Sequence, residues 1–492
     1  MSSSDPEFTG PISPVETGGH PRGLYVLFGA EMWERFSYYG MRALLVLYLT
    51  KHLGYIRKDA LALYALYTGL VYVTPLIGGY LADRVLGQRK AIFVGGIVMA
   101  MGHFAMAFEP MLFLALSLLI LGNGFFKPNI STMVGGLYAQ GDPRRDGAYT
   151  IFYMGINLGA FFSPLVCGYL GEKIGWHYGF GAAGVGMVLG LISFAAFQRL
   201  LVGGLPPGRD EKAEGRLVAR DWVHIVVVSV ICLGVAYAFS LALPSLQPYT
   251  KRLIQAIGVF FALAMVYVLF MAGSKNGTEA GADWQRIAVI LIVGVFSIVF
   301  WMGFEQAGGT LNLFADERTE RSLLGWQFPA SYFQSINPFL IFALAPIFSV
   351  VWARLDATRF RLTSSAKMGI GLLLLGVGFA IMSQADKQSS LAKVGPQWLA
   401  AVYLFNTLGE ICLSPIGLSL VNKLAPARLS SLMMAVWFLC TAIANYLAGT
   451  LEEELTGSKM NIWLFLVATS VIPGLILLAI TRPLQKMGHG RL

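Results

Sequence analysis

Three charged side chains, Glu31, Glu34 and Arg35, lie inside a stretch that is otherwise apolar enough to cross a lipid bilayer. On a helix, Glu31 and Arg35 are four residues apart and share one face, which continues to Arg42. An ionisable group at membrane depth costs roughly 3 kcal/mol or more unless it pairs, lines a wet cavity or acts on a substrate. A salt bridge that only locks two helices together is the structural alternative. The pattern favours a polar transport cavity.

Further charges at membrane depth have opposite signs in the two halves of the chain. The first half supplies the cations Arg35, Arg42 and Lys127, and the second half supplies the carboxylates Glu305 and Glu410. A cleft between the halves would hold a zwitterion such as a short peptide lengthwise, because charge-assisted hydrogen bonds are strong in a low-dielectric cavity. Lys127 could instead snorkel from a helix end, but its place in the middle of an apolar segment argues against this.

The composition is that of a membrane protein. Of 492 residues, 56% are hydrophobic and 13% charged, against roughly 25% charged in soluble domains, and the mean hydropathy is +0.64. The net charge of +9 comes from basic residues in short loops, so it indicates membrane topology and no nucleic-acid partner. Four isolated cysteines and six scattered histidines predict neither a disulfide framework nor a metal site.

The sequence contains no motif of an enzyme or a primary pump. A phosphate-binding GxxxxGK[ST] loop is missing, and so is a convincing acid pair or Ser/His arrangement. We therefore expect a secondary transporter that needs no cofactor.

The apolar segments predict an all-α integral membrane protein with about fourteen transmembrane helices. They lie near 24–53, 60–84, 89–108, 110–138, 146–171, 178–200, 222–243, 250–272, 285–312, 329–354, 366–385, 397–424, 428–453 and 460–481. We divide the chain into a disordered tail (1–22), a six-helix bundle (23–200), a linker (201–221), an additional helix pair (222–272), a second six-helix bundle (285–482) and a tail (483–492). The pair has few charges and is expected to be peripheral.

The distribution of basic residues predicts the orientation. If the N-terminus is cytoplasmic, most lysines and arginines outside the helices fall in cytoplasmic loops, as the positive-inside rule requires. An even number of helices then places both termini in the cytoplasm. The first 22 residues are polar and have no apolar core, so we expect no cleaved signal peptide. The predicted location is the inner membrane, as a multi-pass protein.

The segment GGYLADRVLGQRK (78–90) resembles the loop between helices 2 and 3 of the major facilitator superfamily. Its glycines would let helices approach closely, and its acidic residue with the following arginines could form a cytoplasmic charge latch. An ordinary basic loop is the alternative. The expected gating residues are Gly78, Gly79, Asp83, Arg84, Gly87 and Arg89.

A narrower resemblance covers nearly the whole chain and is to the proton-coupled oligopeptide transporter (POT/PTR) family, of bacterial type. The motifs that carry it are EMWERFSYYG (31–40), GNGFFKPNIS (122–131), FYMGINLG (152–159), FWMGFEQ (300–306), QSINP (334–338), LGEICLSP (408–415) and WFL (437–439). The resemblance implies a major facilitator fold of two six-helix bundles plus two extra central helices. It also implies a symporter that imports di- and tripeptides with protons by alternating access and works as a monomer.

The resemblance assigns the peptide ligands to both halves. The peptide carboxylate would face the cations, which are Arg35, Arg42 and Lys127. The amino terminus would be bound by Glu410, Asn157 and Asn337. Hydrogen bonds to the peptide backbone would come from Tyr38, Tyr39, Tyr72 and Tyr153, and the side-chain pockets from Trp301 and Trp437. For each aromatic residue, helix packing is an equally good explanation.

Proton coupling requires a group that titrates as its surroundings change. The candidates are Glu31 and Glu34 beside Arg35, and Glu305. We expect Glu305 to pair with Arg42 when the extracellular side is closed, and a proton to release the bridge. For Glu31, Glu34 and Arg35, a purely structural ion pair is the alternative explanation. Animal family members use a histidine on helix 2, but 60–84 contains none, so coupling here must rest on carboxylates.

Three other functions stay open. A related transporter of nitrate or another anion would conflict with Glu410, because a carboxylate in the second half would repel an anion. A drug or sugar porter would explain the 78–90 loop but none of the other motifs. A channel or receptor would give passive flux or no flux, so accumulation driven by a pH gradient would distinguish it.

Overall fold

The computed structural model of the chain describes residues 19–139, 142, 144–205, 217–246, 278–323, 325–358, 362–426, 430–456 and 460–489. The first half consists of α1 (Arg22–Lys51), α2 (Arg57–Val73), α3 (Pro75–Leu81), η1 (Ala82–Leu86), α4 (Gln88–Ala105), η2 (Glu109–Met111), α5 (Leu112–Gly136), α6 (Arg144–Tyr169), η3 (Leu170–Ile174), α7 (Trp176–Ala196) and η4 (Gln198–Leu200). Helix α8 (Ala219–Leu246) follows.

The second half begins with α10 (Thr278–Phe304), η6 (Glu305–Gly308), α11 (Thr310–Glu317) and a hairpin of β1 (Ser322–Leu323) and β2 (Trp326–Gln327). The strands are antiparallel, and Ser322 pairs with Gln327. The chain continues through η7 (Ala330–Ser335), α12 (Ile336–Asp356), α13 (Ser364–Ser389), α14 (Gln397–Leu424), α15 (Ser430–Thr456), α16 (Ile462–Ala479) and α17 (Thr481–Met487).

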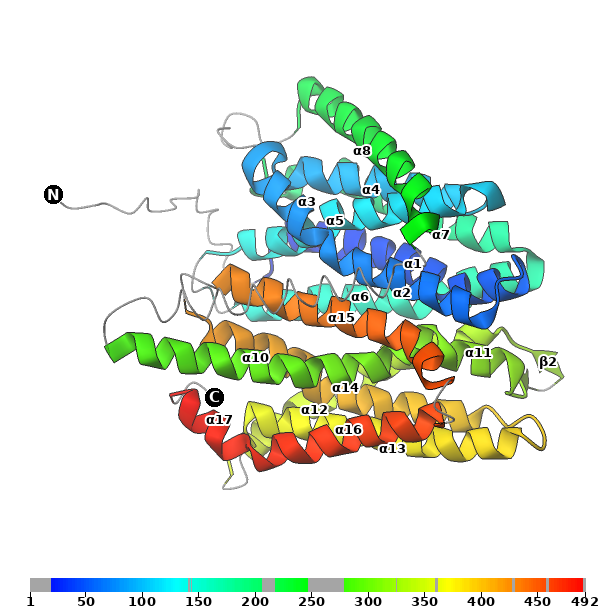
Figure 1. Cartoon of the computed structure of the whole chain (residues 1–492). Helices are drawn as coiled ribbons and strands as arrows, with labels where there is room; N and C mark the ends of the chain where they lie inside the picture. The colour runs from blue at the N-terminus through cyan, green and yellow to red at the C-terminus, as the bar shows by residue number, and fades with distance from the viewer. Residues whose placement is uncertain are drawn as a thin grey trace.

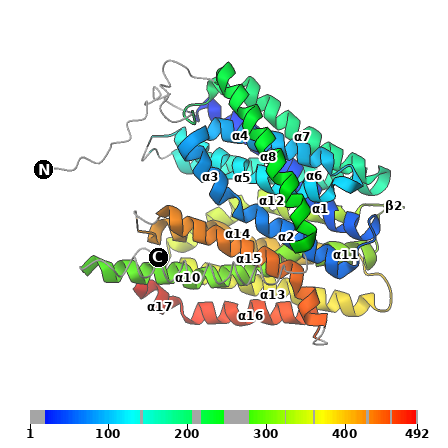
Figure 2. The same cartoon turned by 45° about the horizontal axis from the view of Figure 1, so that its top comes forward.

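The long helices form two bundles that lie against each other. Figure 1 shows α1 to α7 in one bundle and α10 to α16 in the other, and Figure 2 shows the same division after rotation. Ten of the described segments are long and apolar enough to cross a membrane. This arrangement confirms the all-α fold with two six-helix bundles that the sequence predicts.

Two expected spans are interrupted where the sequence suggests continuous helices. The span 60–84 breaks between α2 and α3 at Thr74, because Pro75 has no amide hydrogen to continue the ladder. The span 285–312 begins earlier, at Thr278, and its α-helix ends at Phe304. The chain then continues as the 3₁₀ turn η6, which begins at Glu305. The second break lies at an ionisable residue, and irregular backbone at this depth is typical of a transport site.

Several predicted segment boundaries shift. Arg22, which we assigned to the tail, is the first residue of α1, and the rest of that tail up to residue 18 lies outside the described residues. Part of the 201–221 linker belongs to α8, which begins at Ala219. The predicted second helix of the pair, 250–272, also lies outside the described residues. The 483–492 tail is helical through Met487 in α17.

Helix α8 crosses the outside of the first bundle (Figures 1 and 2) and contacts α4 and α5. Much of its apolar surface is exposed, including Val226, Val230 and Leu241. Its first turn is nonetheless tied to the bundle, because Lys90 of α4 lies 3.5 Å from the buried carboxylate of Asp221. The placement agrees with a peripheral role for this helix.

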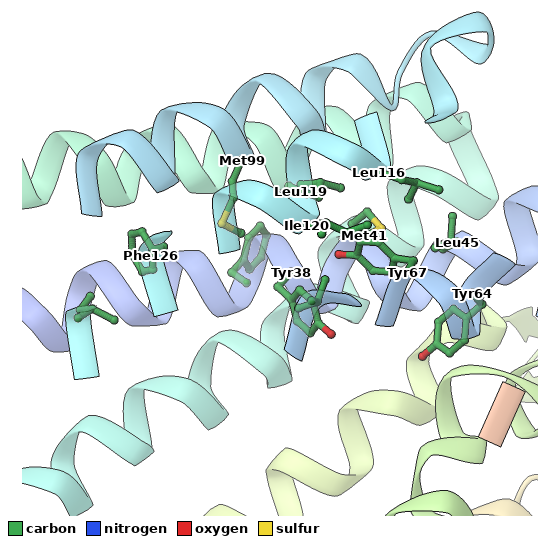
Figure 3. Packing of buried hydrophobic residues seen from close by; sticks show 14 of the residues in the cluster. Tyr38, Met41, Leu45, Tyr64, Tyr67, Met99, Leu116, Leu119, Ile120 and Phe126 are labelled. Carbon is green, nitrogen blue, oxygen red and sulfur yellow. The ribbon is translucent and has the colours of Figure 1, made fainter. Parts of the chain in front are cut away.

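Close backbone contact holds α3 against α5. A side chain at Gly78 would meet the carbonyl oxygen of Gly124 at 2.0 Å, so only glycine fits there. Pro128 lies one turn further along α5 and cannot donate a hydrogen bond to that carbonyl. Elsewhere in the first bundle, the interior is filled by apolar side chains, which include Tyr38 and Met41 (Figure 3).

The two halves also touch through small residues of α2 and α15. A side chain at Gly449 would lie 2.4 Å from Cβ of Ala65, and one at Gly69 would lie 3.6 Å from the carbonyl oxygen of Ala442. The two helices therefore cross with their backbones close together at these glycines.

Ion pairs join the halves at the end of the molecule where α1 finishes, which we call the closed end. Lys51 binds Asp316 at 2.9 Å, and Arg57 binds Glu317 at 2.9 Å. Both pairs link the first half to α11 of the second. In the predicted orientation this is the extracellular side.

Candidate functional site

A cavity of about 270 Å³ lies between the two bundles. Residues from both halves line it. From the first half these include Tyr39, Arg42, Tyr72, Lys127, Tyr153 and Asn157. From the second half they include Trp301, Glu305, Asn337, Tyr403, Glu410 and Trp437.

An ion pair crosses the cavity between Arg42 of α1 and Glu305 of η6. Both side chains are buried, and the Arg42 Nε also donates a 2.6 Å hydrogen bond to the hydroxyl of Tyr64. Gly308 makes room for this arrangement, since a Cβ there would lie 1.8 Å from the Tyr64 hydroxyl and 3.2 Å from the Arg42 Nε. The pairing of Arg42 with Glu305 that we expected for a closed extracellular side is therefore present.

A second charged cluster lies within the first half. The Arg35 Nε contacts the carboxylate of Glu34 and lies 3.3 Å from Glu31. Lys127 Nζ donates a 2.7 Å hydrogen bond to the same oxygen of Glu31. One Glu31 oxygen and one Arg35 nitrogen are buried without a hydrogen-bond partner. These side chains are thus paired with one another, but two of their polar atoms are left without a hydrogen bond.

A carboxylate faces this cluster from the opposite bundle. Glu410 of α14 accepts a 2.7 Å hydrogen bond from the Asn337 side chain, which also donates to the Thr407 hydroxyl at 3.0 Å. In the described part of the chain, Glu410 has no cationic partner within salt-bridge distance. It is therefore the available acid of the second-half wall.

Asn157 behaves differently from Asn337. Its amide donates a 2.9 Å hydrogen bond to the carbonyl of Tyr153, one turn earlier on α6, although it lines the cavity. Binding a peptide amino terminus through Asn157 would use its amide oxygen, because an ammonium group donates hydrogen bonds and cannot accept them.

Two residues that we predicted to contact the peptide do not line the cavity. The guanidinium of Arg35 is turned toward the carboxylates of Glu31 and Glu34, and Tyr38 packs in the apolar interior of the first bundle (Figure 3). Arg35 also lies 5.1 Å from the centre of the Tyr38 ring. Arg35 shares a helix face with Arg42, but it does not reach the cavity because it pairs with two carboxylates of its own helix. Direct substrate contacts by these two are not supported by this geometry.

The sequence reasoning missed several polar residues of the cavity, namely Gln334, Tyr403, Asn406, Ser414 and Thr441. Helical spacing could have found some of them. Asn406 and Ser414 are four residues before and after Glu410, and Thr441 is four residues after Trp437, so each pair shares one helix face. Tyr64 and Gly308, which position Arg42, carried no such signal.

The predicted gating loop does not form a charge latch in the described residues. Asp83 is exposed without an ion pair, and Arg84 stacks on Tyr80 at 5.9 Å. Arg89 is fully buried and donates hydrogen bonds to the carbonyls of Leu201 and Gly203 at 2.8 and 2.7 Å. Arg89 thus fixes the start of the linker to α4, and a gating role for the loop stays a prediction.

The glycines of this loop have clear structural reasons. Gly87 has a φ of 77°, which side chains rarely adopt, and it lets the chain turn from η1 into α4. Gly78 permits the contact with α5 described above, whereas a Cβ at Gly79 would only touch Pro128 at 3.7 Å.

Within the described residues, no group of three or more His, Cys, Asp or Glu side chains is placed to hold a metal ion. The four cysteines are buried and unpaired. The charged side chains that line the cavity can bind ionic groups and exchange protons.

Comparison with known proteins identifies the architecture. Residues 89–462 match the model of the POT family. The chain is 35% identical to the peptide transporter YePEPT of Yersinia enterocolitica over 95% of each chain. It is 32% identical to a di-/tripeptide transporter of Lactococcus lactis over 95% of this chain and 97% of the relative. A crystal structure of the peptide transporter POT in complex with sulfate superposes with a TM-score of 0.81 at 36% identity, covering 97% of each chain.

Proposed function

The chain belongs to the POT family of transporters, and we propose that it is a proton-coupled symporter that imports di- and tripeptides by alternating access. As a family member it is a transport protein and not an enzyme. The names of its relatives, which are peptide and di-/tripeptide transporters, support this choice of substrate.

One observation carries the proposal, which is the opposite charge of the two cavity walls. Lys127 and Arg42 lie on the first-half wall, and Glu410 lies on the second-half wall. A zwitterion with separated charged ends fits such a cavity, whereas an anion would meet the carboxylate of Glu410. Charge-assisted hydrogen bonds at both ends would orient the peptide and leave its side chains to the aromatic residues Trp301 and Trp437.

We assign the peptide carboxylate to Lys127 and Arg42, and the amino terminus to Glu410 with Asn337. Both cations are already bound to acids, Lys127 to Glu31 and Arg42 to Glu305. The substrate carboxylate must replace these acids, and a proton on either acid removes its competition. Proton and peptide therefore favour binding of each other, which is the thermodynamic requirement for symport.

The proposal includes the cellular setting. The protein acts in the inner membrane with both termini in the cytoplasm, functions as a monomer, and uses the proton gradient without a cofactor. The closed end, sealed by Lys51–Asp316 and Arg57–Glu317, then faces outward. The structure would represent a conformation in which the substrate exchanges with the cytoplasm.

The test is uptake of labelled dialanine into proteoliposomes that contain the purified chain. An inward proton gradient and a negative-inside potential are imposed and then collapsed with a protonophore. We expect concentrative uptake that disappears with the gradient and is competed by di- and tripeptides but not by free alanine. Absence of peptide flux in a folded sample would contradict the proposal, and flux that does not concentrate would indicate a channel.

A further inference from the structure

A buried acid of the first half binds the beginning of a second-half helix at the closed end. Glu172 of η3 accepts hydrogen bonds from the backbone amides of Ala330 and Ser331, at 2.8 and 2.9 Å. These are the first amides of the membrane-spanning segment Ala330–Leu355, and helical hydrogen bonds do not use them. The Glu172 side chain is only 6% exposed.

The surrounding residues hold this contact in place. Arg321 lies 3.7 Å from the Glu172 carboxylate and binds Asp316 at 2.8 Å, and Asp316 is also the partner of Lys51. Gly168, one turn before Glu172, faces the Ser331 side chain so closely that a Cβ would lie 2.0 Å from its hydroxyl. The junction thus combines a buried charge with direct backbone packing.

This junction differs from the other ion pairs of the closed end. In the pair of Arg57 with Glu317, the side chains are 33% and 47% exposed, so water can replace either partner easily. The Glu172 carboxylate instead accepts two amide hydrogens in a site nearly closed to solvent. Hydrogen bonds to a charged acceptor are stronger than neutral ones, and a helix N-terminus favours negative charge.

We infer that Glu172 stabilises the closed end, in addition to the ion pairs described above, by capping the first turn of η7 across the interface between the halves. Opening of this end separates η3 from η7 and leaves both amides and the carboxylate to water. The contact therefore stabilises the closed conformation relative to the open one, and weakening it raises the fraction of molecules in which this end is open. Glu172 is a positioning residue and does not touch the substrate.

The test measures a distance across the closed end. Spin labels are attached at Ile56→Cys in the first half and Leu391→Cys in the second, both on exposed side chains. Double electron–electron resonance spectroscopy then gives the distribution of distances between the two labels in lipid nanodiscs without substrate. In Glu172→Gln the negative charge is lost. The NH2 group of the new side chain would also face one of the two backbone N–H groups, and two donors cannot form a hydrogen bond. We expect at least a threefold larger fraction of the long, open distance.

Glu109→Gln is the matched control. Glu109 also lies at the closed end, but its partner His52 belongs to the same half and its side chain is 59% exposed. This variant should leave the distance distribution unchanged. An equal shift in both variants, or no shift in Glu172→Gln, would overturn the inference.

A second variant acts on the other side of the contact. Ala330→Pro removes one donor and leaves Glu172 intact, and proline suits the first position of a helix. It should also raise the fraction of open molecules. If Glu172→Gln does not fold, this variant alone tests the inference by the same criterion.

The inference rests on the alternating access proposed above. Because the distances are measured without substrate, its failure is distinguishable from a failure of peptide transport.

Discussion

Replacing Glu410 by glutamine should weaken binding of peptides that carry a free amino terminus. The substitution keeps the shape of the side chain and can keep the 2.7 Å contact with Asn337, but it removes the negative charge of the second-half wall. Glu410 is 8% exposed, so solvent screens its attraction for an ammonium group only weakly.

The structure allows the size of this effect to be worked out. A hydrogen bond to a charged partner contributes about 1.5–3 kcal/mol, and each 1.4 kcal/mol is a tenfold change in the dissociation constant. Glu410→Gln should therefore weaken dialanine binding by roughly 10- to 150-fold.

Calorimetric titration with two ligands isolates the charge. Dialanine carries the ammonium group, whereas N-acetyl-dialanine has the same backbone and carboxylate without it. The wild-type protein should prefer dialanine, and Glu410→Gln should lose most of that preference without weakening the acetylated ligand further. If both ligands lost affinity by the same factor, or dialanine lost less than threefold, Glu410 would not bind the amino terminus.

Three further variants test coupling, carboxylate binding and packing. Glu305→Gln removes the titratable partner of Arg42, so uptake driven by a pH gradient should stop while counterflow exchange continues; loss of both in a folded protein would contradict a dedicated coupling role. Lys127→Met should weaken binding of dialanine by about tenfold or more but leave dialanine amide unaffected, and an equal loss for both would exclude a contact with the carboxylate. Gly78→Ala should lower stability by about 1–3 kcal/mol, because its Cβ would lie 2.0 Å from a backbone oxygen, whereas Gly79→Ala should not; thermal unfolding in detergent compares the two, and equal midpoints would refute the packing argument.

The arrangement of helices was largely predictable because lipid imposes a simple rule on sequence. A crossing helix needs a long apolar stretch, and 397–424 coincides with α14 (Gln397–Leu424). The rule says nothing about interruptions inside a stretch, so the break at Glu305 was missed. The break arises where Glu305 meets Arg42 of the other half, which is a tertiary contact.

The candidate site was predictable to the extent that charges are rare in lipid. Arg42, Lys127, Glu305 and Glu410 stand out in apolar segments, and all four line the cavity. Helical spacing, however, could not tell whether a charged group would face the cavity or a neighbour on its own helix. Arg35 shares a face with Arg42 but is held by the adjacent carboxylates.

Contacts made through the backbone left little trace in the sequence. Glu172 is an ordinary acid near the end of a helix, and its partners are amides, which every residue except proline carries. Arg89 likewise binds carbonyl groups of the linker, although its motif suggested a salt bridge. Such contacts follow from the placement of the helices and can be read only from the structure.

The crossing of α2 and α15 bears on how quickly the halves can move. Interlocked side chains would have to leave their grooves before one helix could rotate past the other, and each such step adds a barrier. At this crossing Gly69 and Gly449 present bare backbone to the opposite helix, so a rolling motion changes few side-chain conformations. We therefore expect this crossing to add little to the barrier, so that the time spent in each conformation depends on the other contacts between the halves, such as the ion pairs at the closed end.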